Sequence, residues 1–116
     1  MRPRSASENE IHMKAWQWLQ GAFPALLAFH VPNERKASVQ YHMKLKRIGV
    51  VPGVADFLVF PQSGRKVAIE LKDDKGAQSP EQIKFQLFWE RAHGLYFLCR
   101  TLEEFQGVVN AITLFA

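Results

Sequence analysis

Two short apolar runs separated by a tight turn constrain the fold of this chain more than any other feature. Residues 57–60 are apolar without interruption, which is typical of a strand covered on both faces. Pro61, Ser63 and Gly64 then favour a turn, and residues 65–71 alternate as a second strand does. Because the connection is too short for a crossover, we predict an antiparallel hairpin.

Helix and strand signals alternate on either side of this hairpin. Ser79 followed by Pro80 is typical of a helix start, and residues 95–99 beyond that helix form a further apolar run of strand length. A strand, a helix and a strand in this order permit a parallel crossover. The remaining predicted elements are a helix over 8–20 ended by Gly21 and Pro24, a strand within 26–31, a helix in the later part of 35–48, an end of the third helix at Gly94, and a last helix begun at 101–104. The pattern predicts a three-layer α/β fold around a mixed sheet.

Length and composition limit the class of protein. A chain of 116 residues suits one domain, which we expect over residues 7–116 after a flexible tail of residues 1–6. Cys99 is the only cysteine, so no intrachain disulfide can form. No apolar run reaches the roughly 20 residues of a membrane span, and the start lacks a signal-peptide pattern. These features favour a cytoplasmic protein without a membrane partner.

The chain carries a net charge of +4 and has a pI near 9.5. Lysine and arginine contacts to phosphates release condensed counterions, so a cationic domain of this size is compatible with a nucleic-acid partner. The same charge is equally compatible with a role in solubility alone. The net charge by itself therefore does not decide the function.

Charged residues gather at the end of the predicted hairpin. Side chains alternate along a strand, so Glu70 and Lys72 share one face while Leu71 points to the other. Asp56 stands directly before the first strand of the hairpin. Because the second strand returns beside the start of the first, the hairpin places Asp56 next to Glu70.

This set of residues is suited to phosphodiester hydrolysis. Two carboxylates offer hard oxygen ligands for Mg²⁺, and a divalent cation lowers the pKa of water and neutralises charge in the transition state. A lysine beside them can orient the water or stabilise the developing oxyanion. The alternative is that these are solvated charges at strand ends, because Glu-X-Lys occurs by chance in many proteins. The preceding residues 53–56, at hairpin distance, favour the functional interpretation.

The chain resembles the VRR-NUC domains of the PD-(D/E)XK nuclease superfamily over about residues 7–112. The matching segments, in chain order, are Ser7-Glu8 with Ile11, then 31–34, 52–58, 68–72, 79–82, Gly94 and Cys99-Arg100. The resemblance implies a restriction-endonuclease-like fold and a DNA nuclease that depends on Mg²⁺ or Mn²⁺. Compact phage and bacterial members, to which this chain is similar, act as homodimers on branched DNA such as Holliday junctions in DNA repair.

The resemblance also implies roles for individual residues. Asp56 and Glu70 would bind the metal together with the backbone carbonyl of Leu71, and Lys72 would be the catalytic lysine. Glu8 would be the acidic residue of the first helix, ligating the metal directly or through water.

Three further positions follow from the same resemblance. Glu10 replaces Glu8 as the helix acid if the register of the first helix differs from the one expected. Gln82 would face the site and help to position a phosphate or the lysine, although simple helix capping is an equal alternative. Ala55 stands where the family has proline, and His12 where it commonly has glutamine, which leaves the role of that position open.

Basic residues near the expected site are candidates for DNA binding, or else form a solvated surface. They are Arg35, Lys36, Lys44, Lys46, Arg47 and Lys75. The four histidines show no metal-like spacing along the chain, which disfavours zinc. Cys99 is expected in the core. The aromatic residues Trp16, Phe85, Phe88 and Trp89 are expected there too, and any that is exposed would indicate a dimer surface.

The sequence leaves three functions in competition. The first is a metal-dependent endonuclease that cuts branched DNA as a homodimer, in which two sites related by a two-fold axis cut symmetric strands. The second is a monomeric nicking or flap-type nuclease. The third is a DNA-binding module with a vestigial site. The intact set of two acids and a lysine argues against the third.

Overall fold

The structure is a computed structural model that describes residues 6–32 and 38–115. Its elements, in chain order, are α1 (Glu8–Ala22), β1 (Leu27–His30), α2 (Val39–Arg47), β2 (Phe57–Phe60), β3 (Val67–Leu71), α3 (Pro80–Arg91), β4 (Leu95–Cys99) and α4 (Leu102–Phe115). Within these residues, no helix combines the length and the apolar character that crossing a membrane requires.

The four strands form one mixed sheet in the order β1-β2-β3-β4. β1 and β2 are antiparallel, and so are β2 and β3, with Phe57 opposite Ile69. β3 and β4 are parallel and are joined through α3. The predicted hairpin, the parallel crossover and the mixed sheet are confirmed.

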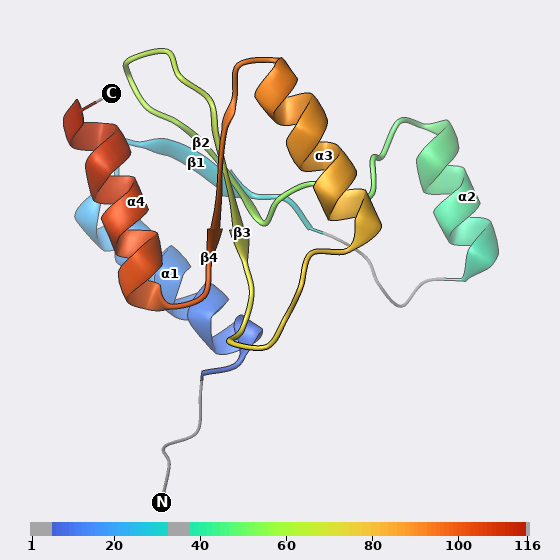
Figure 1. Ribbon diagram of the computed structural model, residues 1–116, viewed down its shortest axis with the longest axis horizontal. Helices are drawn as coiled ribbons and strands as arrows, with labels where there is room; N and C mark the ends of the chain where they lie inside the picture. Colours follow the sequence, from blue (N-terminus) through green and yellow to red (C-terminus); the bar gives the residue numbers. More distant parts are fainter. Residues whose placement is uncertain (1–5, 33–37, 116) are drawn as a thin grey trace, which may run out of the picture.

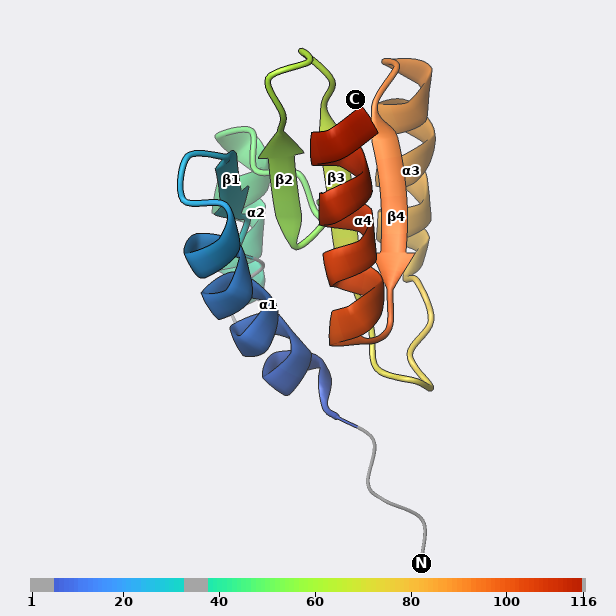
Figure 2. The ribbon, with the colours of Figure 1, turned by 90° about the vertical axis from the view of Figure 1, so that its left-hand side faces the viewer.

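The helices cover the sheet in layers (Figures 1 and 2). α1 and α4 lie side by side on one face, and α3 lies against β4 on the other. α2 stands away from the sheet beyond α3 and has no buried side chain. The predicted three-layer α/β architecture is confirmed. The apolar side predicted for α2 is largely exposed, since Val39 is 73% and Met43 51% exposed, whereas Leu45 is half-buried.

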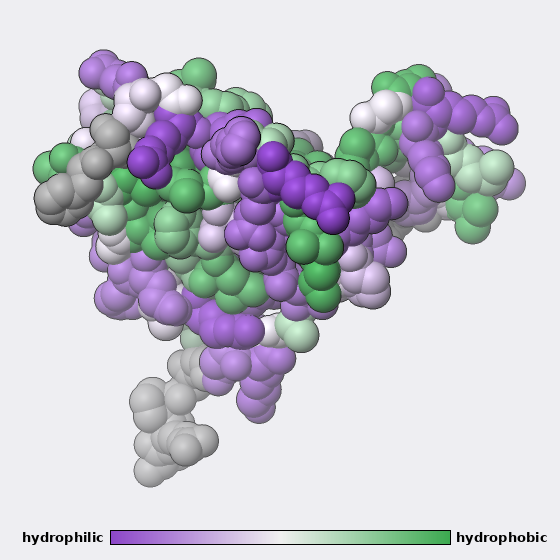
Figure 3. Space-filling view, turned by 45° about the horizontal axis from the view of Figure 1, so that its top comes forward, coloured by the Kyte–Doolittle hydropathy of each residue, from purple (hydrophilic) through white to green (hydrophobic). Residues whose placement is uncertain are grey.

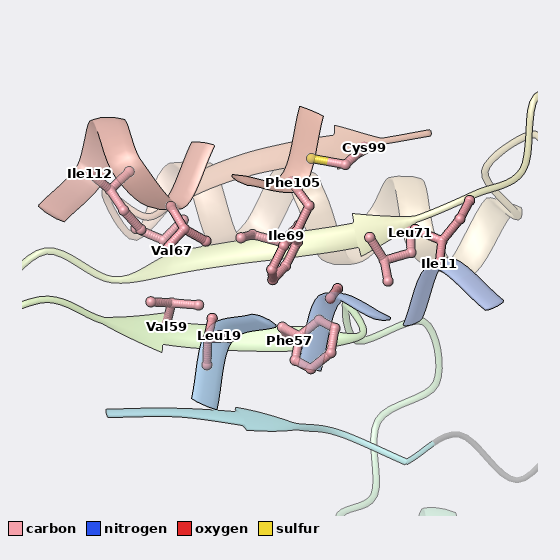
Figure 4. Packing of buried hydrophobic residues seen from close by; sticks show 12 residues of the cluster. Ile11, Leu19, Phe57, Val59, Val67, Ile69, Leu71, Cys99, Phe105 and Ile112 are labelled. Atoms are coloured by element: carbon pink, nitrogen blue, oxygen red, sulfur yellow. The ribbon is translucent and has the colours of Figure 1, made fainter. Parts of the chain in front are cut away.

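The hydrophobic core lies between the sheet and the α1–α4 layer (Figure 4). Phe57 of β2 and Phe105 of α4 are fully buried, with ring centroids 5.5 Å apart. The other core residues are Ile11, Ala15, Leu19, Val59, Val67, Ile69, Leu71, Cys99, Val109 and Ile112. Burial of each large apolar side chain contributes about 1.5–3 kcal/mol. The core therefore holds the β2–β3 hairpin rigidly against α1.

The first helix begins as predicted and ends later than predicted. The Ser7 hydroxyl accepts the N–H of Glu10 at 3.2 Å, which is an N-cap. The prediction that Gly21 ends the helix is wrong, because α1 continues through it to Ala22, and Phe23 still donates its N–H to the carbonyl of Leu19 at 2.9 Å. A glycine inside a helix costs about 1 kcal/mol, which tertiary packing of the helix can offset.

The end of α3 also differs from the prediction. The helix ends at Arg91, and His93, rather than Gly94, takes the left-handed conformation with φ 66°. A glycine is instead needed at position 94 because the Trp89 ring leaves no room for a side chain: a Cβ there would lie 2.3 Å from Trp89 Nε1. The same indole N–H donates to the carbonyl of Leu95 at 2.8 Å. Trp89 is thereby fixed against the start of β4.

One of the aromatic residues expected in the core lies on the surface. Phe88 is 57% exposed on the outer side of α3, beside the exposed residues Ile83 and Leu87. Trp16 packs against the core, and Phe85 is half-buried with its ring near those of Trp89 and Tyr96. The core assignment of Phe88 is therefore wrong.

Gly53 allows the segment before β2 to pass close to the backbone of α3. Its φ is 82°, and a Cβ there would lie 2.4 Å from the carbonyl carbon of Glu81 in the first turn of α3. Gly53→Ala should therefore destabilise the fold by about 1–3 kcal/mol more than Gly64→Ala, because overpacking adds to the strain of a positive φ. Gly64 has φ 90° with nothing within 4 Å, so it is the matched control. Urea unfolding measures both variants, and equal losses would contradict the close approach.

Candidate metal centre

Asp56 is held in place by its backbone and its side chain. Phe57 of β2 pairs with Ile69 of the antiparallel strand β3. Asp56, which precedes Phe57, therefore meets Glu70, which follows Ile69, at the end of the hairpin. Asp56 Oδ2 accepts the N–H of Leu71 at 2.7 Å, and the Asp56 carbonyl accepts the N–H of Val31 at 2.9 Å. His30 Nδ1 lies 2.8 Å from the same carbonyl. The carboxylate therefore has a fixed position.

Glu70 is a buried carboxylate that is only partly satisfied. It is 1% exposed, and its Oε1 accepts the side-chain N–H of Gln82 at 3.0 Å. Its Oε2 is buried without a hydrogen-bond partner in the part of the chain that the structure describes. Burial, followed by the neighbouring Asp56 carboxylate, raises the pKa of Glu70 to about 9. Such a group needs a proton or a cation.

Glu8 completes a group of three carboxylates. One oxygen each of Glu8, Asp56 and Glu70 lies within 4.8 Å of the others. α1 brings Glu8, rather than Glu10, into this group. Closely placed carboxylates repel one another, and hard oxygen donors at such spacing are what Mg²⁺ or Mn²⁺ requires. The Glu70 oxygen that has no partner among the described residues, together with the donor types, fits a divalent cation.

Lys72 follows β3 on the same side as Glu70. It is buried, and its backbone N–H donates to the carbonyl of Cys99 at 3.0 Å, which continues the β3–β4 pairing. Its positive charge lowers the pKa of Glu70 and so partly opposes the effect of burial. Lys72 also lines a cleft, together with Gln82.

Gln82 serves the helix and the site at the same time. The Ser79 N–H donates to Gln82 Oε1 at 2.8 Å, and the Gln82 N–H donates to the Ser79 hydroxyl at 3.2 Å, which is a capping box. The Gln82 amide N–H remains available for Glu70. Gln82 therefore caps α3 and also contacts Glu70, while its role in positioning a phosphate or the lysine stays a prediction.

Arg100 is a residue whose contribution the sequence did not reveal. Its Nη1 donates to the carbonyls of Asp73 and Gly76, at 2.8 and 2.7 Å. A Cβ at Gly76 would lie 3.2 Å from Lys72 Cδ, so this loop packs closely on the lysine. Arg100 thus anchors the loop that covers the Lys72 side chain. An arginine directly after a strand is too common a feature to have predicted this.

A cleft of about 650 Å³ lies between α2 and the start of α3. Figure 3 shows α2 standing apart from the body of the molecule at this side. Lys72 and Gln82 line the cleft, facing Tyr41, His42 and Lys46 of α2. The cleft therefore lies between the basic helix α2 and two residues that neighbour Glu70, namely Lys72 and Gln82.

The predicted DNA-binding residues are distributed unevenly around this cleft. Lys46 lines it, while Lys44 and Arg47 are exposed elsewhere on α2. Lys75 is exposed in the loop after Lys72, and its N–H donates to Asp73 Oδ1 at 3.0 Å. Arg35 and Lys36, like Asn33 and Glu34 of the matching segment 31–34, lie outside the described residues.

Two histidines converge on Asp56, although their spacing along the chain gave no sign of it. A ring nitrogen of His12, a ring nitrogen of His30 and an Asp56 carboxylate oxygen lie within 4.8 Å of one another. Burial and the nearby His30 lower the pKa of His12, while Asp56 acts in the opposite direction. The lowered pKa favours the neutral ring. The signal in the sequence was the spacing of four between Glu8 and His12, which places both on one helix face.

The chain has the fold of VRR_NUC domain structures. A solved structure described as "VRR_NUC domain protein" is similar to it with a TM-score of 0.72 and 17% identity, covering 92% of this chain and 88% of that one. A second, described as "VRR_NUC domain", has a TM-score of 0.57 and 15% identity, covering 90% and 97%. No family model matches the sequence. No curated protein matches it significantly. The predicted resemblance is confirmed at the level of the fold.

Proposed function

We propose that this chain is a divalent-metal-dependent endonuclease that hydrolyses phosphodiester bonds in DNA. The observation that carries the proposal is the buried pair Asp56 and Glu70, with Glu8 close by. Among the residues that the structure describes, one Glu70 oxygen has no hydrogen-bond partner. Burial of carboxylates without compensation is costly, so carboxylates kept together in this way need a proton or a cation between them, and a divalent cation satisfies several of them at once. The similarity to VRR_NUC domain structures supports the same function.

Each residue of the proposed metal centre has its own role. Asp56 and Glu70 would bind Mg²⁺ or Mn²⁺ together with the backbone carbonyl of Leu71, and Glu8 would bind it directly or through water. When bound, the cation lowers the pKa of water and neutralises charge on the phosphate. Gln82 holds one oxygen of Glu70 and so orients that carboxylate.

Lys72 provides the positive charge that the reaction needs. It is buried beside Glu70 at the wall of the cleft, where an ammonium group interacts strongly with a phosphate oxygen. In the proposed reaction, Lys72 orients the attacking water or stabilises the charge that develops on the phosphate.

We further propose that the substrate is branched or otherwise structured DNA and that the enzyme is a homodimer. The exposed apolar residues of α3, Ile83, Leu87 and Phe88, offer a surface for self-association. A two-fold dimer presents two sites to symmetric strands, as a Holliday-junction resolvase needs. A monomeric nicking or flap-type nuclease is the alternative. We propose that the protein is bacterial or phage-encoded, acts in the cytoplasm and serves DNA repair.

Cleavage of a matched set of substrates tests this function. Linear, nicked, flap and four-way DNA of the same sequence is incubated with the chain in Mg²⁺, in Mn²⁺ or in excess EDTA. We expect metal-dependent cleavage with a preference for the four-way substrate. Preference for the nicked or flap substrate would favour the alternative enzyme. Binding without cleavage in any metal would identify a DNA-binding module with a vestigial site.

The α2 helix should contribute to DNA binding through its basic residues. Lys46→Ala and Arg47→Ala should each weaken binding and reduce the slope of log affinity against log salt by about 0.9 for each duplex phosphate that the side chain neutralises. Fluorescence anisotropy over a salt series measures both quantities. Arg65→Ala, in the turn at the opposite end of β3, removes the same charge as Arg47→Ala and serves as control. An equal effect of all three variants would assign the binding to net charge alone.

A further inference from the structure

We propose that His12 and His30 add nitrogen ligands to the metal bound at Asp56, so that the centre binds first-row transition-metal dications such as Mn²⁺ in preference to Mg²⁺. The inference rests on the proposed function, because Asp56 belongs to the carboxylate group described above. It adds two residues from α1 and β1 to the site and narrows the class of cation.

The position of the two rings is the first support. One ring nitrogen of each histidine and an Asp56 carboxylate oxygen lie within 4.8 Å of one another, and the ring centroids are 4.3 Å apart in an edge-on arrangement. His12 lies one helical turn after Glu8 on α1, on the face that meets the carboxylates. The histidine group and the carboxylate group thus share Asp56 and share one face of α1.

The hydrogen bond of His30 is the second support. Its Nδ1 is 2.8 Å from the carbonyl oxygen of Asp56, which can only accept, so Nδ1 carries the proton. In the neutral ring, Nε2 then offers a lone pair. Metal-binding histidines usually donate their other N–H to a carbonyl or a carboxylate in this way, which fixes the tautomer and the orientation of the ring.

The ligand chemistry determines which cations benefit. Imidazole is a good ligand for transition-metal dications, whereas Mg²⁺ prefers oxygen and dehydrates reluctantly. A centre made only of Glu8, Asp56 and Glu70 would accept either kind of ion. Imidazole ligands strengthen the binding of a transition-metal dication without strengthening the binding of Mg²⁺. The centre should therefore prefer Mn²⁺ to Mg²⁺.

Packing against Phe57 is the competing explanation for the two rings. The Phe57 ring centroid lies 4.7 Å from that of His12 and 5.9 Å from that of His30. A packing role alone predicts that loss of either imidazole changes stability without changing the choice of metal. The two explanations therefore differ in a measurable quantity.

Metal binding by the full chain tests the inference without reference to activity. Isothermal titration with Mn²⁺ and with Mg²⁺ is carried out on the unaltered chain, His12→Gln and His30→Gln. We expect each substitution to reduce the Mn²⁺ affinity by about tenfold or more and to leave the Mg²⁺ affinity unchanged. His93→Asn is the control, because His93 lies at the far end of β4 and asparagine tolerates its positive φ.

Spin-echo spectroscopy of bound Mn²⁺ makes the test independent of how the variants fold. The unaltered chain should show ¹⁴N coupling from imidazole. Bound Mn²⁺ without ¹⁴N coupling, or equal losses for both metals in the two variants, would overturn the inference and leave the proposed function intact. Failure of the unaltered chain to bind either ion would overturn both.

Discussion

Asp56→Asn should reduce metal-dependent DNA cleavage by about a hundredfold or more while leaving the fold in place. Substitution of residues that only support a metal ligand typically lowers metal affinity or activity by about 10–100-fold. Loss of the charge on a direct ligand should therefore lower activity by at least the upper end of that range. Asparagine keeps the size of the side chain and an oxygen that can accept the N–H of Leu71. Single-turnover cleavage at saturating metal measures the effect.

Two comparisons make this prediction specific. Asp74→Asn removes the same charge from an exposed position in the loop after Lys72, so it should retain activity. Asp56→Asn should also be more stable than the unaltered chain in EDTA, because it removes a negative charge that disfavours ionised Glu70. An inactive variant that is less stable without metal would indicate damage to the fold. Full activity of Asp56→Asn would exclude the proposed metal ligand.

The metal-free fold should lose stability as the pH rises from about 4.5 to about 9. Burial and the Asp56 carboxylate raise the pKa of Glu70 from 4.5 to about 9 in the folded chain. Between these values, the folded chain keeps a proton that the unfolded chain has released, so a rising pH favours unfolding. One such group gives a slope of up to about 1.4 kcal/mol per pH unit. Urea unfolding in EDTA across this interval measures the slope.

Substitution and metal addition should each remove this pH dependence. Glu70→Gln has no carboxyl to titrate and should show a much flatter profile. A divalent cation replaces the proton on the folded chain, so saturating Mn²⁺ should restore stability at the alkaline end of the interval. The other charged groups near Glu70 are Asp56, Glu8 and Lys72, and all three are present in the variant. Identical slopes for Glu70→Gln and the unaltered chain would contradict the buried state of Glu70.

The features that the sequence predicted well depend on local geometry. A short turn and a period of two place Asp56 beside Glu70 wherever this hairpin forms. The capping box of Ser79 and Gln82 is likewise a property of four consecutive residues. The parallel crossover followed from the order of the elements. Each of these could be predicted because the residues involved are close in the chain or joined by a fixed ladder.

The wrong predictions concern segments whose packing depends on residues that are distant in the sequence. α3 carries apolar residues on more than one face, and only the position of β4 decides that Phe85 and Trp89 turn inward and Phe88 outward. A helix can pass through Gly21 when packing compensates for its propensity. Gly94 was predicted to end α3, whereas it is the neighbouring Trp89 ring that leaves no space for a side chain at this position.

The strand pair of Asp56 and Glu70 was determined by the sequence itself, together with the kinds of ligand atom that it carries. The tertiary structure decided what surrounds that pair. Packing of α1 on one face of the sheet brings Glu8 and His12 to Asp56, and β1 brings His30 to the same carboxylate. Burial under these elements raises the pKa of Glu70 and leaves Oε2 without a partner among the described residues. Desolvation and charge repulsion depend on distances in space, and residues far apart in the chain acquire such distances only when the core forms.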